Sequence, residues 1–221
     1  SRPRAKEEDS RLVWMYWHEC ERAIPTLTLI SEDEKAAVEM RIAATGSLGH
    51  ALSCMTALLS HPRAKEEDSG LVWMYWHECE RAIRTLTSIS VDEKAAVEMR
   101  IAATGSLGQA LSCMTALLSR PRAKEEDSRL VWMYWHGCEG AIRTLPSISE
   151  DEKAEVEMRI AAIESLGHAL FCMTALLSRP RAKEEDSRLV WMSWHECERA
   201  IRTLTSISED KKAAVEMRIA A

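Results

Sequence analysis

The chain repeats itself with a fixed period. The string Pro-Arg-Ala-Lys-Glu-Glu-Asp-Ser begins at Pro3, Pro62, Pro121 and Pro180, so successive copies start 59 residues apart. Such a period indicates a tandem array in which one unit cannot bury its apolar surface alone and stacks on its neighbours. We therefore expect one continuous repeat domain, with complete units at 1–59, 60–118 and 119–177 and a partial unit at 178–221.

Composition favours helices over strands within each unit. Eight glycines, six prolines and no asparagine in 221 residues leave little material for β-hairpin turns. Ala, Leu, Met, Glu, Arg and Lys dominate, and these residues lose least on entering a helix. The fold class predicted is all-α. The unit length and motifs do not match tetratricopeptide, ankyrin, HEAT or leucine-rich repeats.

The first half of each unit predicts an amphipathic helix. In the first copy it covers Leu12 to Leu27, and Pro3 followed by three acidic residues fits an entry near Pro3. Its apolar stripe consists of Val13, Trp17, Cys20, Ile24 and Leu27. Pro25 is expected to shorten this helix by a turn in the first copy only.

The second half of each unit predicts another helix. Ser31 and Glu34 have the spacing of a capping box, so this helix is expected to begin at Ser31. Pro146 would then lie in the connection between the two helices. The expected stripe is Val38, Ile42, Thr45, Gly49, Leu52 and Leu59, with Leu48 and Met55 at its edge.

Continuity through Gly46 decides the number of helices in a unit. Glu164 replaces this glycine in the third copy, and a Glu in a left-handed cap would cost about 1 kcal/mol. This favours one long helix of about 28 residues, paired with the first as an antiparallel hairpin. A break at Gly46, giving three helices in each unit, stays open as the alternative.

The second helix carries a further apolar face opposite its stripe. This face consists of Met40, Ala43, Ala44, Ala51, Cys54 and Leu58. A helix buried on two sides lies inside a layered array, so the hairpins are expected to stack as a solenoid or superhelix. The first and last copies are as apolar as the middle ones. We therefore expect either a fragment of a longer array or an assembly whose ends another chain covers.

Large apolar residues crowd the first helix of every unit. The run from Leu12 to Trp17 cannot fit on one stripe, so neighbouring units cover part of it or it forms a repeated partner-binding surface. The candidate partner-binding residues are Trp14, Met15, Trp17, Trp73, Met74, Trp76, Trp132, Met133, Trp135, Trp191, Met192 and Trp194.

Charge and cysteine content restrict the partners and the compartment. A net charge of -6 with interleaved signs argues against a nucleic-acid surface. The uncharged stretch from Ile42 to His61 reads as a buried helix rather than a membrane span, although a membrane-associated array remains an alternative. Seven cysteines without close pairs favour a reducing, cytoplasmic environment.

No residue pattern predicts catalysis or a cofactor. His50 and Cys54 share a helix face, which keeps a zinc-binding array as an alternative, but two ligands do not make a site and Gln109 replaces the histidine in the second copy. We expect no metal and no enzymatic activity. The predicted function is a structural scaffold that binds a protein partner or a second copy of itself through repeated weak contacts.

Overall fold

The computed structural model describes residues 18–60, 69–118, 128–177, 187–210 and 215–221. Within these ranges, side chains are described at 18–58, 77–116, 139–174, 195–210 and 215–221. The described residues form helices joined by short turns, as the composition predicts. Residues 18–32 are helical, and the helices that follow are α2 (Val38–Ser60), α3 (Ser69–Val91), α4 (Val97–Leu118), α5 (Ser128–Glu150), α6 (Val156–Leu177), α7 (Ser187–Glu209) and α8 (Val215–Ala220).

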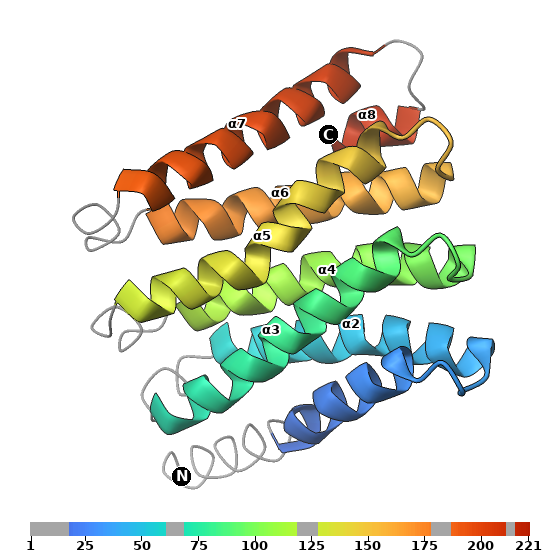
Figure 1. Cartoon of the computed structure of the whole chain (residues 1–221), viewed down its shortest axis with the longest axis vertical. Helices are drawn as coiled ribbons and strands as arrows, with labels where there is room; N and C mark the ends of the chain where they lie inside the picture. The colour runs from blue at the N-terminus through green and yellow to red at the C-terminus, as the bar shows by residue number, and fades with distance from the viewer. Residues whose placement is uncertain (1–17, 61–68, 119–127, 178–186, 211–214) are drawn as a thin grey trace, which may run out of the picture.

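The helices form two layers that cross each other (Figure 1). The first helices of the units, 18–32, α3, α5 and α7, make one layer, which we call the A layer. The second helices, α2, α4, α6 and α8, make the B layer. Within the B layer α2 packs on α4, α4 on α6 and α6 on α8, while α3, α5 and α7 follow one another in the A layer. The predicted stack of helical hairpins is confirmed.

The core runs through the stack between the two layers. Each complete unit contributes a fully buried leucine from its B helix, at Leu48, Leu107 and Leu166. Burying such a side chain contributes about 1.5–3 kcal/mol. Leu48 was placed at the edge of the predicted stripe, but it lies at the centre of the core, whereas Val38 of that stripe is exposed. Thr45 and Leu52 of the predicted stripe are fully buried, as are its edge residues Leu48 and Met55, so the stripe was correct in part.

The predicted start of the second helix is wrong. Ser31 lies inside the first helix, where its hydroxyl donates to the carbonyl of Leu27 at 2.9 Å. The turn forms two residues later, because Asp33 Oδ1 accepts the Lys35 amide at 3.0 Å. The second helix begins at Val38, so the B helices have 22 or 23 residues rather than about 28.

An arginine from each of α2, α4 and α6 closes its hairpin. Arg41 Nε donates to the carbonyl of Ser31 at 3.2 Å, at the end of the preceding helix. The same bond joins Arg100 to Ser90 and Arg159 to Ser149. These carbonyls belong to the last turn of a helix, where backbone acceptors lack intrahelical donors. The arginine therefore stabilises the last turn of the A helix, which continues past the position where the capping box predicted the second helix to begin.

Pro25 and Pro146 both lie inside helices, which corrects the expectations that Pro25 shortens its helix and that Pro146 lies in a connection. Pro146 is within α5 and not in the connection, and the helix of residues 18–32 continues through Pro25 without losing a turn. The other copies have threonine where the third has Pro146, and Thr28 and Thr87 donate their hydroxyls to the carbonyls of Ile24 and Ile83. Pro146 lacks this bond as well as its own backbone N–H.

The B helices are continuous through their glycines. Gly46 lies in the middle of α2 and Gly105 in the middle of α4, and each helix is a single segment. In its described part, each complete unit is thus a hairpin of two helices, and the break at Gly46 that would give three does not occur.

Candidate functional site

The units are joined in the B layer by a seam of small residues. Gly49 of α2 faces Ser106 of α4, and a Cβ built on Gly49 would lie 2.4 Å from Ser106 Oγ and 3.1 Å from its Cα. Only glycine allows the two backbones to approach this closely. The approach lets Ser106 Oγ donate to the carbonyl oxygen of Thr45 at 3.0 Å. A side-chain hydroxyl thus bonds to the backbone of the preceding unit.

The next pair of units repeats this seam. Ser165 Oγ of α6 donates to the carbonyl of Thr104 at 2.7 Å, and a Cβ on Gly108 would lie 2.8 Å from Ser165 Oγ. Gly46 and Gly105, by contrast, have open space beside them. Of the two glycines in each of the first two B helices, the second therefore makes the contact between units.

One face of α4 and one face of α6 are covered by the preceding unit. Met99 and Met158 are fully buried there, whereas Met40, at the same position in the first unit, is 56% exposed. Cysteines show the same difference, since Cys113 and Cys172 are buried and Cys54 is exposed. The second apolar face predicted from the sequence is confirmed as a contact between units, and on α2 its residues Met40, Ala43 and Cys54 are exposed while Ala44 is buried.

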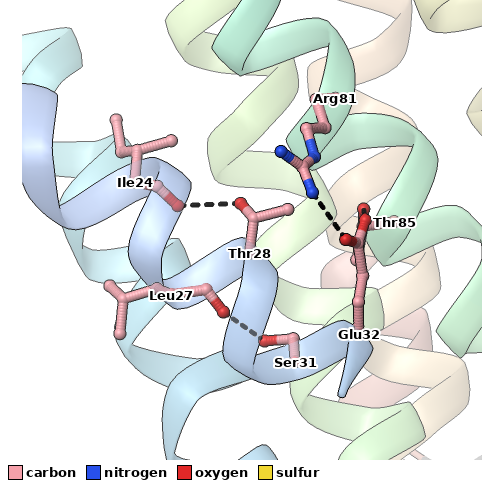
Figure 2. A network of polar contacts seen from close by, with 7 residues as sticks. All are labelled: Ile24, Leu27, Thr28, Ser31, Glu32, Arg81 and Thr85. Atoms are coloured by element: carbon pink, nitrogen blue, oxygen red, sulfur yellow. Dashed lines mark hydrogen bonds and ion pairs between the residues drawn. The ribbon is translucent and has the colours of Figure 1, made fainter. Parts of the chain in front are cut away.

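The A layer adds polar contacts between units (Figure 2). Glu32 of the first unit accepts hydrogen bonds from Arg81 at 2.7 Å and Thr85 at 2.5 Å, both on α3. Burial raises the pKa of the Glu32 carboxyl, but these hydrogen bonds and the Arg81 charge outweigh burial and leave the pKa below its usual value of 4.5. Thr203 donates to Glu150 in the same way at 2.6 Å.

The contact between α3 and α5, which we call the second joint of the A layer, lacks this ion pair. Val91 stands at the position of Glu32, and Gly140 stands at the position of Arg81. Both partners are replaced at the same joint, so α3 and α5 meet there without the ion pair. The seam between Gly108 and Ser165 and the buried core hold this joint together.

Two cysteines meet inside the second unit. Cys79 Sγ of α3 lies 3.3 Å from Cys113 Sγ of α4, and both side chains are fully buried. The corresponding pair in the first unit is more open: burial and the neighbouring Cys54 raise the pKa of the Cys20 thiol. Raised thiol pKa values lower the thiolate fraction, so Cys20 has the character of a structural rather than a reactive cysteine.

The predicted partner-binding residues are not tested by these contacts. Trp14, Met15 and Trp17 lie outside the described residues. The counterparts at 73, 74 and 76 are on α3, those at 132, 133 and 135 on α5, and those at 191, 192 and 194 on α7, but their side chains lie outside the described part as well. A repeated tryptophan surface therefore stays a prediction.

The zinc and membrane alternatives gain no support from the described residues. His50 and Cys54 are both exposed on α2, and no cluster of three or more His, Cys, Asp or Glu side chains in the described ranges has a metal-binding arrangement. His168, the counterpart of His50, lies 2.8 Å from Ser112 Oγ. No helix in the described part of the chain combines the length and apolar character needed to cross a membrane.

The comparisons with known proteins concern the fold alone. No protein-family model matches the chain, and no curated protein is significantly similar to it. A solved structure described as "Computational Design of Self-Assembling Cyclic Protein Homooligomers" is similar, with a TM-score of 0.56 and 14% identity. The match covers 97% of this chain and 80% of that chain. The stacked helical architecture is therefore shared with a chain from designed self-assembling oligomers.

Sequence reasoning missed the ladder of Glu32, Arg81 and Thr85. Arg81 and Thr85 are 49 and 53 positions after Glu32, and the sequence of each unit was considered separately. Reading positions across adjacent copies could have found the pair, because an acid near the end of one A helix and a base in the next recur. The absence of both at Val91 and Gly140 obscured this pattern.

Proposed function

We propose that this protein is a non-enzymatic helical scaffold that associates with copies of itself. The observation that supports this most directly is the 56% exposure of Met40 on a face that is fully buried at Met99 and Met158. A surface that packs between units inside the chain is chemically suited to pack between chains. Exposed apolar side chains on such a surface favour association because their burial removes them from water.

The architectural similarity is consistent with this proposal. The similar solved structure is described as a self-assembling homooligomer, and at 14% identity the resemblance extends to the fold only. Repeated units suit a scaffold, because several equal weak contacts on one chain raise the avidity without new chemistry. Binding of another protein through the tryptophans of the A helices is the alternative use of the same repetition.

The proposal is tested by measuring mass against concentration. Sedimentation velocity and light scattering over about a hundredfold range of concentration should show a mean mass that rises above the 25.0 kDa of one chain. Reducing agent should be present, so that disulfides between exposed Cys54 residues do not contribute. A mass that stays at 25.0 kDa throughout would contradict self-association.

A further inference from the structure

We propose that a second copy stacks head to tail, with its first unit on the fourth unit of the copy before it. This inference rests on the proposed self-association and assigns the surfaces that carry it. The contacts would be those that already join units inside the chain, continued from one molecule to the next. Two sets of exposed residues, one at each end of the stack, support this assignment.

The polar set comes from the A layer. Glu209 is the fourth-unit counterpart of Glu32 and is exposed at the end of α7. Arg22 and Thr26 are the first-unit counterparts of Arg81 and Thr85, and both are exposed on the helix of residues 18–32. Between the first and second units these positions form the ion pair and hydrogen bond of Figure 2, and between the third and fourth units Thr203 bonds Glu150 while Arg199 donates to Ser147. One end thus presents the carboxylate and the other presents the guanidinium, beside Thr26, whose hydroxyl donates to the carbonyl of Arg22 at 2.8 Å.

The apolar set comes from the B layer. Ile219 on α8 is 80% exposed, whereas its counterparts Ile42 and Ile101 are half-buried beneath the following unit. Met40 at the opposite end is 56% exposed, and its counterpart Met99 is buried on the face that meets the preceding unit. Stacking a first unit on a fourth unit brings the Met40 face toward Ile219, as Met217 of the fourth unit shares a cluster with Ile160 of the third inside the chain.

The proposed contact is not self-limiting. The two ends carry different residues, which makes the interface heterologous. A heterologous contact leaves one donor end and one acceptor end open after each addition, so copies continue into a ring or a filament.

Charge reversal at the two ends tests the orientation directly. Glu209→Arg places arginine at both ends, and Arg22→Glu places glutamate at both ends, so each variant alone should repel its own kind. We expect the dissociation constant for self-association of each variant to be at least about tenfold higher than that of the unmodified chain. An equimolar mixture should recover the association, because every contact in it then pairs an arginine with a glutamate.

The controls separate this inference from the proposed function. Glu152→Arg changes an exposed acid in a turn by the same charge and should associate as the unmodified chain does. Circular dichroism of all variants confirms that the helices are intact. If the unmodified chain never associates, the proposed function fails. If it associates but the end variants associate as Glu152→Arg does, head-to-tail stacking is wrong and self-association stands. The same conclusion follows if the mixture of end variants does not regain association, or if it forms assemblies of no more than two copies.

Discussion

Ser106 of α4 donates its hydroxyl hydrogen to the carbonyl oxygen of Thr45 in α2, at 3.0 Å. That carbonyl belongs to the preceding unit, so the bond reports directly on how units join. The same bond runs from Ser165 to Thr104 at 2.7 Å, whereas Ser47, at this position in the first unit, is exposed. The repetition therefore provides matched positions that differ only in whether a neighbour covers them.

Replacing Ser165 by alanine should lower the free energy of unfolding by about 1 kcal/mol, because a buried hydrogen bond between units is lost. Ser47→Ala makes the same chemical change on the exposed face of α2 and should have no destabilising effect, since alanine favours the helix. Urea unfolding followed by circular dichroism measures both. Equal losses at the two serines would contradict the role given to the seam.

Alanine at Gly49 should destabilise the protein, because its Cβ would overlap Ser106 and force the two helices apart. Overpacking of this kind costs about 1–3 kcal/mol. Gly46→Ala, three residues earlier in open space, should instead stabilise α2 by about 0.5–1 kcal/mol. Opposite shifts in the urea midpoint would confirm the prediction, and shifts of one sign would refute it.

Pro146→Thr should stabilise the protein, since it restores the backbone N–H of α5 and the threonine hydroxyl that the other copies use. A proline inside a helix costs about 3 kcal/mol, so a gain of about 1–3 kcal/mol is expected. The reverse change, Thr87→Pro in α3, is the matched control and should destabilise by a similar amount. Thermal unfolding by circular dichroism compares the two variants.

The lowered pKa of Glu32 predicts a pH-dependent contribution to stability. A carboxyl with a depressed folded-state pKa stabilises the fold above its unfolded pKa, and this contribution is lost as the pH falls through the folded-state value. Glu32→Gln should therefore reduce stability at pH 7 by about 0.2–1 kcal/mol, the range for an exposed pair. Once the pH has fallen below the folded-state pKa of Glu32, the variant and the unmodified chain should unfold alike. A difference that persists in acid would show that charge is not the cause.

The sequence predicted the architecture better than the helix ends. The 59-residue period and the two apolar faces of the B helix suffice for stacked hairpins, because hydrophobic periodicity reports which faces are buried. Ser31 and Glu34 have the spacing of a capping box, yet the preceding helix continues to Glu32, and Arg41 of the same hairpin donates to the carbonyl of Ser31 in its last turn. α3 ends at the equivalent Val91, where Arg100 donates to Ser90 in the same way. The contact that accompanies this boundary comes from the second helix, and a local motif carries no information about it.

Prediction of the site was limited for a related reason. The large aromatic residues attract attention as a binding surface, and their side chains lie outside the described part of the chain. The contacts that do join units depend on small or charged residues such as Gly49, Ser106 and Glu32. A glycine or serine gains such a role only when a second helix lies against it, which no single helical pattern reveals.

Val91 and Gly140 stand between the second and third units where Glu32 and Arg81 stand between the first and second. The two contacts between A helices should therefore respond differently to salt. Added salt screens exposed ion pairs but leaves apolar packing intact. Rising ionic strength should therefore weaken the A-layer contact between the first and second units by at most about 1 kcal/mol, the upper value for an exposed pair. The contact between α3 and α5 has no ion pair at these positions and should not respond in this way.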